Sequence, residues 1–156
     1  MTRWRDTADG NRVLQFVCVT RKDNGQRAIP GGMVEPGATV SATIAAEFGE
    51  EALNKLDMTD ADQVVMLDLL DDLFAEGVEI YTGYVDDPRN TDNAWMETTV
   101  LHVHDDTGAI FSKFPLSAGD DAASVFWLDI TADMGDLYAN HRVFIDAAAA
   151  RVKDHP

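Results

Sequence analysis

The feature that most constrains this chain is a long loop, rich in glycine and proline, placed between a buried strand and a helix. Residues 13–20 form an almost uninterrupted apolar run, which indicates a buried β-strand. Residues 22–37 have the composition of a loop, and their glycines allow the main chain to approach a ligand. Residues 39–54 place apolar side chains among alanines, a pattern typical of a helix that begins at a Thr39 or Ser41 cap.

The remaining segments predict a mixed α/β (α+β) fold. Apolar residues at helical spacing indicate two more helices, and short alternating or apolar runs indicate three more strands. The expected helices span residues 59–74 and 138–153, and the expected strands span residues 78–85, 95–103 and 125–130. We therefore expect a mixed sheet sandwiched between helices. No linker, repeat or low-complexity tract divides the sequence, so residues 1–156 are expected to form a single domain.

The composition excludes several classes of protein. Lysine and arginine number 12 against 28 aspartates and glutamates, and the net charge of -16 would repel nucleic acid and anionic lipid. We expect no nucleic acid partner and no membrane partner, and the sequence leaves the oligomeric state open. Cys18 is the single cysteine, which rules out an internal disulfide and fits a reducing compartment. Because the sequence has no apolar stretch of membrane-spanning length and no signal-peptide core, we expect a cytoplasmic protein.

Three glutamates on the predicted helix carry the most informative chemistry. Glu47, Glu50 and Glu51 stand at positions i, i+3 and i+4, so their carboxylates share one helix face. Their mutual repulsion costs roughly a few tenths of a kcal/mol for each exposed pair. A divalent cation such as magnesium would turn the cluster into a favourable set of oxygen ligands. From the residues alone, a metal site and an ordinary solvated acidic face remain open as alternatives.

The loop and the helix together resemble a known motif. The Nudix box, with the general pattern G-x5-E-x7-R-E-U-x-E-E-x-G-U, resembles residues 28–37 (AIPGGMVEPG) and residues 47–54 (EFGEEALN). The second run is similar to mitochondrial-type ADP-ribose pyrophosphatases and to the Nudix-like domain of ADP-ribose-gated cation channels. Further resemblance to that family lies in residues 2–4, 84–98, 118–122 and 137–141. The resemblance implies the Nudix fold in a single hydrolase domain, and we expect the N-terminal domain of the longer enzymes to be absent.

The resemblance also implies an activity and a cofactor. Members of this family hydrolyse ADP-ribose to AMP and ribose 5-phosphate with magnesium, for which manganese is a substitute. The expected metal ligands are Glu47, Glu50 and Glu51 with the carbonyl of Gly31. Glu50 and Glu51 are therefore the expected catalytic carboxylates. Asp120 is the candidate for a catalytic base contributed by a loop, and a capping or turn role for Asp120 is the alternative.

The same resemblance implies the residues that contact the ADP-ribose ligand. These are Asp87, Arg89, Tyr138, Asn140 and His141. The planar guanidinium of Arg89 suits a diphosphate. From the residues alone, Arg89 is interpreted as a turn residue paired with a neighbouring aspartate, and Tyr138 and His141 as the packed start of a helix.

Two departures from the charged positions of the Nudix box matter. The pattern has glutamate where this sequence has Ala38 and arginine where it has Ala46. Without the arginine, the carboxylates are expected to be positioned less precisely. A displacement of even about 1 Å can cost roughly a hundredfold in rate, so a slow enzyme is expected. The alternatives are a catalytically weak or inactive domain that senses ADP-ribose, and a Nudix hydrolase for another nucleoside diphosphate derivative.

Three further residues are interpreted as structural or solvated. His102 and His104 alternate on a predicted strand and share a face, but no third ligand suggests itself. We therefore expect these histidines to be exposed to solvent rather than to bind a metal. Trp95 is expected to belong to the core rather than to stack on adenine.

Overall fold

The main sheet is built around one long strand, β2 (Arg12–Arg21). The computed structural model describes residues 1–53, 58–114, 116–117 and 122–154. Strand β7 (Ala122–Asp129) pairs antiparallel with one edge of β2, while β1 (Thr2–Asp6) and β3 (Arg27–Ala28) pair antiparallel with the other edge. The short strand β6 (His104–Asp105) then pairs parallel with β1. The sheet is therefore mixed, as the sequence predicts.

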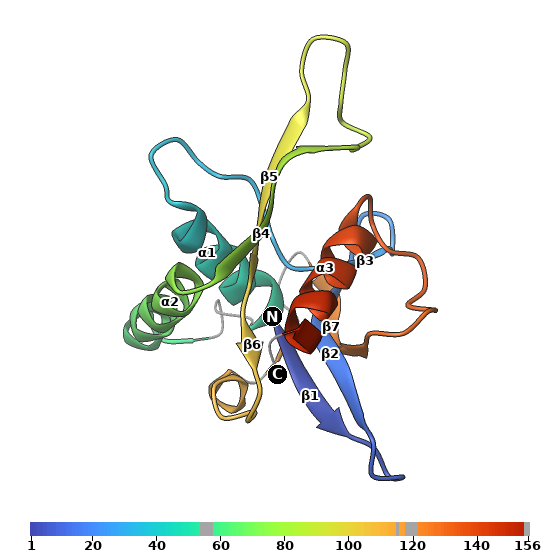
Figure 1. Cartoon of the computed structure of the whole chain (residues 1–156). Coiled ribbons are helices and arrows are strands. Elements are labelled where there is room, and N and C mark those ends of the chain that lie inside the picture. The colour runs from blue at the N-terminus through green and yellow to red at the C-terminus, as the bar shows by residue number, and fades with distance from the viewer. Residues whose placement is uncertain (54–57, 115, 118–121, 155–156) are drawn as a thin grey trace.

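A second, two-stranded sheet extends away from the main one. Strands β4 (Val78–Val85) and β5 (Met96–His102) pair antiparallel, with Val85 opposite Met96 at the far end. Figure 1 shows this hairpin running between the α1–α2 pair and α3, with the 86–95 loop beyond them. The inner end of the hairpin therefore lies beside the helices, and its outer end projects from them.

Three helices flank the strands. Helix α1 (Val40–Ala52) is capped by Thr39, and helix α2 (Asp60–Ala75) is capped by Thr59. In both caps the threonine side chain accepts an N–H from the first turn, which satisfies one of the backbone donors that a helix start leaves free. Helix α3 (His141–Asp154) closes the described part of the chain.

The alternation of side chains along β2 divides the core between these helices. Val17 belongs to a buried cluster with Phe48 of α1 and Leu70 of α2. Phe16 points to the opposite face of the strand and packs with Ile145 of α3. The main sheet is thus covered by α1 and α2 on one face and by α3 on the other, which confirms the predicted sandwich.

Most elements were predictable in kind and place. Strand β4 has the expected bounds, and helix α3 begins at His141 rather than at residue 138. Strands β1, β3 and β6 and the short 3-10 helix η2 (Phe111–Lys113) were not predicted. Asn54, at the end of the predicted first helix, lies outside the described residues. None of the helices described here has the length and apolarity to cross a membrane.

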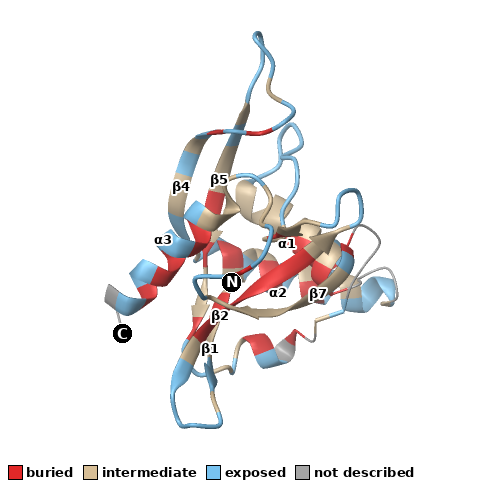
Figure 2. Ribbon diagram, turned by 90° about the vertical axis from the view of Figure 1, so that its right-hand side faces the viewer, coloured by how far each residue is buried: buried red, intermediate tan, exposed pale blue. Residues whose placement is uncertain are grey.

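Two sequence-based interpretations are wrong. Trp95 is 61% exposed instead of lying in the core, because the outer end of the hairpin projects into solvent, as Figure 2 shows. His102 is only 6% exposed instead of solvated, because the end of β5 meets the start of β1, where the N–H of Thr2 donates to the carbonyl of Val103 at 2.9 Å. The hydroxyl of Thr2 lies 2.8 Å from His102 Nε2 and 2.9 Å from His104 Nδ1, so it joins both imidazoles.

Candidate active site

A cavity of about 520 Å³ lies between β2, the glycine loop, α1, the β4–β5 hairpin and α3. Most of the site residues expected from the sequence line it, namely Gly31, Glu51, Asp87, Arg89, Tyr138, Asn140 and His141. The structure therefore brings together residues that stand far apart in the sequence. Glu47 and Glu50 lie outside the cavity lining, and Asp120 lies outside the described residues.

The glycine loop and the acidic face of α1 meet at one side of this cavity. The N–H of Gly31 donates a hydrogen bond to Glu51 Oε2 over 3.2 Å. Gly32 approaches the carboxyl group of Glu47 so closely that an added Cβ would collide with both of its oxygens. Glu50, on the same face, is exposed. The loop main chain thus forms a cradle around the carboxylates that only glycine at position 32 permits.

The donors at this cradle fit a hard divalent cation. Carboxylate and main-chain carbonyl oxygens are the ligands that magnesium prefers, and the ligands expected from the sequence, Glu47, Glu50, Glu51 and the Gly31 carbonyl, are of these kinds. In the described part of the chain, no three acidic, histidine or cysteine side chains already converge as a complete metal site. Magnesium usually keeps several waters and takes one or two carboxylates plus substrate phosphates, so such a partial set suits it.

A buried carboxylate organises a second part of the cavity lining. Asp87 is 6% exposed and accepts two bonds from the Arg89 guanidinium, from Nε at 2.8 Å and from Nη2 at 2.9 Å. Tyr138 donates its hydroxyl to the same carboxylate at 3.1 Å. These bonds, above all those from Arg89, hold the pKa of Asp87 well below its usual range. The turn pairing expected for Arg89 is confirmed, and its contact with a nucleotide stays a prediction.

His141 ties the start of α3 to the glycine loop. Its Nδ1 accepts the main-chain N–H of Ile29 over 3.0 Å, which places the ring proton on Nε2. Burial lowers the pKa of His141 to about 4, so the ring is neutral at physiological pH. Ala139, just before the helix, has a φ of 44°, a left-handed conformation that costs a non-glycine residue roughly 1 kcal/mol. That turn brings both of its neighbours, Tyr138 and Asn140, to the cavity.

The sequence analysis did not identify one of the two arginines that line the cavity. Arg21, at the end of β2, lines the cavity and stacks its guanidinium over the ring of Tyr138, with 4.4 Å between Cζ and the ring centroid. The signal in the sequence was weak, because an arginine at the end of a strand has no pattern of its own. Only its position directly before the glycine loop pointed to the site.

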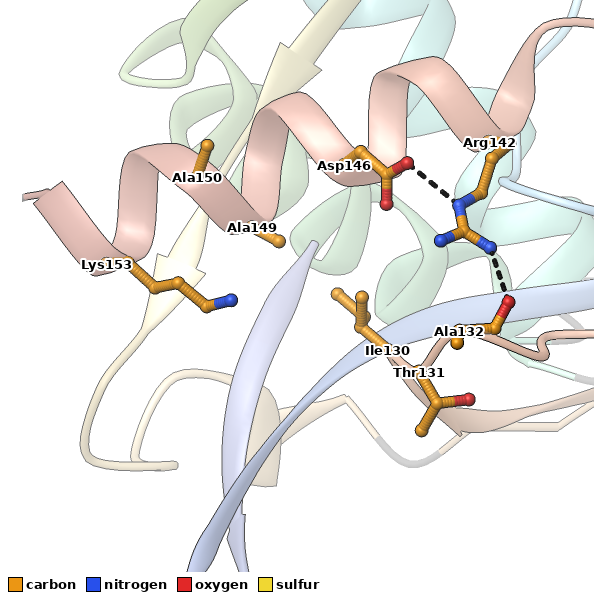
Figure 3. Close-up of a pocket in the computed structure, with 8 residues that line it drawn as sticks. All are labelled: Ile130, Thr131, Ala132, Arg142, Asp146, Ala149, Ala150 and Lys153. Carbon is orange, nitrogen blue, oxygen red and sulfur yellow. Dashed lines mark hydrogen bonds and ion pairs between the residues drawn. The ribbon is translucent and has the colours of Figure 1, made fainter.

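A second depression, of about 470 Å³, which we call the outer depression, lies between α3 and residues 130–132 (Figure 3). Its one guanidinium is already engaged, because Arg142 donates to Asp146 at 2.8 Å and to the carbonyl of Ala132 at 3.0 Å. The depression contains none of the residues expected to bind a ligand. The chemistry of the chain is thus concentrated in the larger cavity.

Comparison of the sequence with characterised proteins gives relatives of two kinds. Transient receptor potential cation channel subfamily M member-like 2 of Nematostella vectensis is 49% identical over 160 residues, which cover 99% of this chain and 10% of that protein. The mitochondrial ADP-ribose pyrophosphatase of Rattus norvegicus is 48% identical over 165 residues, which cover 99% of this chain and 47% of that protein. The chain therefore spans half or less of the length of either relative. No family model matches the chain.

Solved structures give a likeness of fold. The NUDIX domain of Shewanella oneidensis NrtR, complexed with ADP ribose, matches with a TM-score of 0.62 and 14% identity, over 97% of this chain and 84% of that one. A bifunctional NMN adenylyltransferase/ADP ribose pyrophosphatase from Francisella tularensis, complexed with AMP and a Mn ion, matches with a TM-score of 0.60 and 19% identity, over 88% of this chain and 38% of that one. At such identities the likeness concerns the fold alone.

Proposed function

Because this chain belongs to the Nudix superfamily, we propose that it hydrolyses the diphosphate bond of ADP-ribose, releasing AMP and ribose 5-phosphate. The resemblance found in the sequence is confirmed by the relatives, and the Nudix fold by the solved structures. The activity itself comes to this chain from the name of a relative twice its length, so it is a proposal. We extend the proposal to residues 1–156 acting as one catalytic domain, and a cytoplasmic location stays a prediction.

The observation that carries the proposal is the presence of two kinds of group in the lining of one cavity. Gly31 and Glu51 belong to the cradle of oxygen ligands. Arg89 lines the same cavity and is fixed by the buried carboxylate of Asp87. A diphosphate needs both, because a cation and a guanidinium fork each offset part of its negative charge. The arrangement therefore supports a nucleoside diphosphate derivative as the ligand.

Each residue has a separate task in this proposal. Glu47, Glu50 and Glu51 with the Gly31 carbonyl would hold magnesium, or manganese in its place. When bound, the cation would offset the charge of the diphosphate and lower the pKa of the attacking water. Arg89 would orient the phosphates, because Asp87 prevents its guanidinium from turning away.

The remaining contacts and the base complete the assignment. Tyr138, Asn140 and His141 would contact the nucleotide from the start of α3, with His141 offering its neutral Nε2–H as a donor. Glu50, Glu51 and Asp120 stay the candidates for the group that takes the proton from water. Replacing each with its amide separates them, because only the base should lower turnover far more than ADP-ribose affinity.

The deciding experiment is incubation with ADP-ribose and magnesium, with AMP release followed by chromatography. We expect magnesium-dependent AMP release, and we expect Glu51→Gln to slow it by at least about a hundredfold. Glu35→Gln is the matched control. Glu35 is an exposed glutamate of the glycine loop that precedes α1, and it stands at a variable position of the box. If the parent releases no AMP, or if Glu47, Glu50 and Glu51 can all be alanine without loss, the proposed hydrolysis is wrong.

An ADP-ribose sensor is the second candidate, favoured by the two departures from the box. Ala46 is half-buried on α1 directly before Glu47, and Ala38 is exposed in the loop. Both side chains are uncharged methyl groups, so neither can form an ion pair that orients the carboxylates. A sensor would bind ADP-ribose without releasing AMP. The double variant Ala38→Glu with Ala46→Arg would then gain hydrolysis that the parent lacks. Parallel assays with ADP-glucose and NADH test the remaining alternative, a hydrolase for another nucleotide derivative.

A further inference from the structure

Arg21 places a second cation at the cavity, beside the one that the sequence predicts. Its guanidinium lies over the face of the Tyr138 ring, at 4.4 Å from the centroid. The hydroxyl of the same tyrosine bonds to Asp87, which holds Arg89. The two guanidinium groups are thus attached to one tyrosine, one through the ring face and one through the hydroxyl and a shared carboxylate. All four side chains line the same cavity.

The contacts that hold Arg21 use only some of the N–H donors of its guanidinium. Asp23 accepts from Nε at 3.0 Å and from Nη2 at 2.7 Å, which uses two of the five N–H groups of a guanidinium. The described part of the chain supplies no acceptor for the other three. Asp23 is exposed, so it orients the fork without burying it. The fixed geometry resembles that of Arg89, whose partner Asp87 also accepts from only some of the guanidinium N–H donors.

A purely structural role does not account for this pair of cations. A guanidinium over a tyrosine ring stabilises a fold by about 0.5–1 kcal/mol at an exposed site. The hydrogen bonds to Asp23 raise the pKa of Arg21, and the like charge of Arg89 opposes that rise only weakly. Both side chains are open to solvent, at 37% for Arg21 and 57% for Arg89. In a chain with a net charge of -16, both guanidinium groups keep N–H donors at the cavity beyond those that Asp23 and Asp87 occupy, and such donors suit an anionic occupant.

We propose that Arg21 is a second phosphate-binding residue. Arg21 and Arg89 together bind the diphosphate of the ligand, and the Tyr138 ring fixes the plane of the Arg21 guanidinium. The inference rests on the proposed function and names the part of the ligand that is recognised. It makes two linked phosphates the preferred anion, because two forks joined by one tyrosine suit two adjacent anionic groups. A nucleoside without phosphate should bind independently of Arg21.

The test is the binding of ADP-ribose, adenosine and inorganic pyrophosphate to Arg21→Gln, measured by calorimetry without added metal. We expect the variant to bind ADP-ribose and pyrophosphate about 10- to 100-fold more weakly than the parent, the effect of losing charged hydrogen bonds worth about 1.5–3 kcal/mol. Adenosine affinity should stay unchanged. Arg21→Lys keeps the charge without the fork and should recover part of the loss. In turnover, the KM for ADP-ribose should rise while kcat stays within about threefold.

Arg142→Gln is the matched control, because Arg142 is also an exposed, carboxylate-bound arginine but lies at the outer depression instead of the cavity. It should leave all three affinities unchanged. A second readout separates charge from structure, since the affinity of the parent for pyrophosphate should fall with added salt more steeply than that of Arg21→Gln.

Two results would overturn the assignment. If Arg21→Gln binds ADP-ribose and pyrophosphate as the parent does, Arg21 binds no phosphate, whether or not the parent hydrolyses ADP-ribose. If the variant loses adenosine binding to the same extent, Arg21 acts only by supporting Tyr138. A parent that binds pyrophosphate through Arg21 but neither binds nor cleaves ADP-ribose would keep the phosphate site and refute the proposed function.

Discussion

Gly32 is the residue at which the shape of the loop and the chemistry of the helix meet. Its main chain lies where an added Cβ would collide with the carboxyl group of Glu47. The φ angle of Gly32 is not in the left-handed region, so alanine is allowed by the backbone and only the carboxylate is in its way. Glu47 is a flexible side chain that can move aside. Gly32→Ala should therefore displace a proposed metal ligand without unfolding the loop.

We expect Gly32→Ala to raise the magnesium concentration for half-maximal AMP release by at least about tenfold. The free energy of unfolding should stay within about 0.5 kcal/mol of the parent, because the position is exposed. Gly31→Ala is the control, since an added Cβ there meets nothing within 4 Å and the carbonyl is kept. Equal magnesium dependence in both variants would mean that Glu47 holds no metal.

At the scale of single residues, the sequence identified candidate site residues better than it predicted the burial and the contacts of each side chain. The glutamates and Arg89 belong to a motif, so their types and spacing were informative without the fold. The surroundings of Arg21, Trp95 and His102 depend on partners distant in the chain. Arg21 joins the site through Tyr138, and His102 is buried by Thr2, a contact across 100 positions. No local pattern contains such contacts, so these residues were missed or misread.

At the scale of elements, the pairing of α1 with α2 sets the position of the acidic face. Phe48 of α1 is 3% exposed and meets Phe74 of α2 edge-on, with 6.0 Å between ring centroids and 67° between ring planes. Phe48→Ala should lower the free energy of unfolding by about 3–5 kcal/mol, because a buried aromatic ring leaves both a cavity and lost transfer energy. Urea unfolding followed by circular dichroism measures this change.

Val64→Ala on α2 is the comparison, because that side chain is 59% exposed and its loss should cost less than about 0.5 kcal/mol. If the two substitutions cost the same, the helix pair is not held through Phe48. The experiment thereby tests whether the helix pair that carries the acidic face is stabilised through Phe48.

Elements were predictable where their own pattern decides their structure. Helix α2 shows this, because Thr59 and Asp62 form the capping contact that their spacing predicts. Strand β1 shows the opposite, since its sequence, TRWRD, is dominated by charge and has no apolar run. It forms because Arg3 bonds to Gln15 of β2 and Arg5 to Asp129 of β7. Its stability thus comes from neighbours across the sheet, which the local sequence does not contain.

At the scale of the whole molecule, two neutral histidines make stability depend on pH. Burial lowers the pKa of His102 to about 3 and that of His141 to about 4. Both rings have an ordinary pKa near 6.5 when the chain unfolds, so the unfolded state binds more protons below about pH 6.5. Stability is therefore complete above that pH and is lost as the pH falls towards 4. Each histidine contributes a slope of about 1.4 kcal/mol per pH unit.

A second effect of the whole molecule opposes the first. The net charge of -16 repels itself in the compact state, and acid reduces that repulsion as carboxylates take up protons. Carboxylates held at a lowered pKa, such as Asp87 and Asp105, lose their contribution only below about pH 4. The histidines therefore dominate differences between variants from pH 6 to pH 4.5, although the absolute curve combines both effects.

The measurement is urea unfolding of the parent, His102→Gln, His141→Asn and the double variant at half-unit steps between about pH 7.5 and pH 4.5, a window that contains the titration of both imidazoles in the unfolded chain. The amides keep an acceptor for Thr2 and for Ile29 respectively, so these hydrogen bonds are retained although the ring contacts are lost. We expect each single variant to reduce the acid slope by about 1.4 kcal/mol per pH unit and the double variant to reduce it by both amounts. Because the charge background is common to all four proteins, it cancels in the comparison. Parallel curves for the parent and the double variant would show that neither imidazole is kept neutral by the fold.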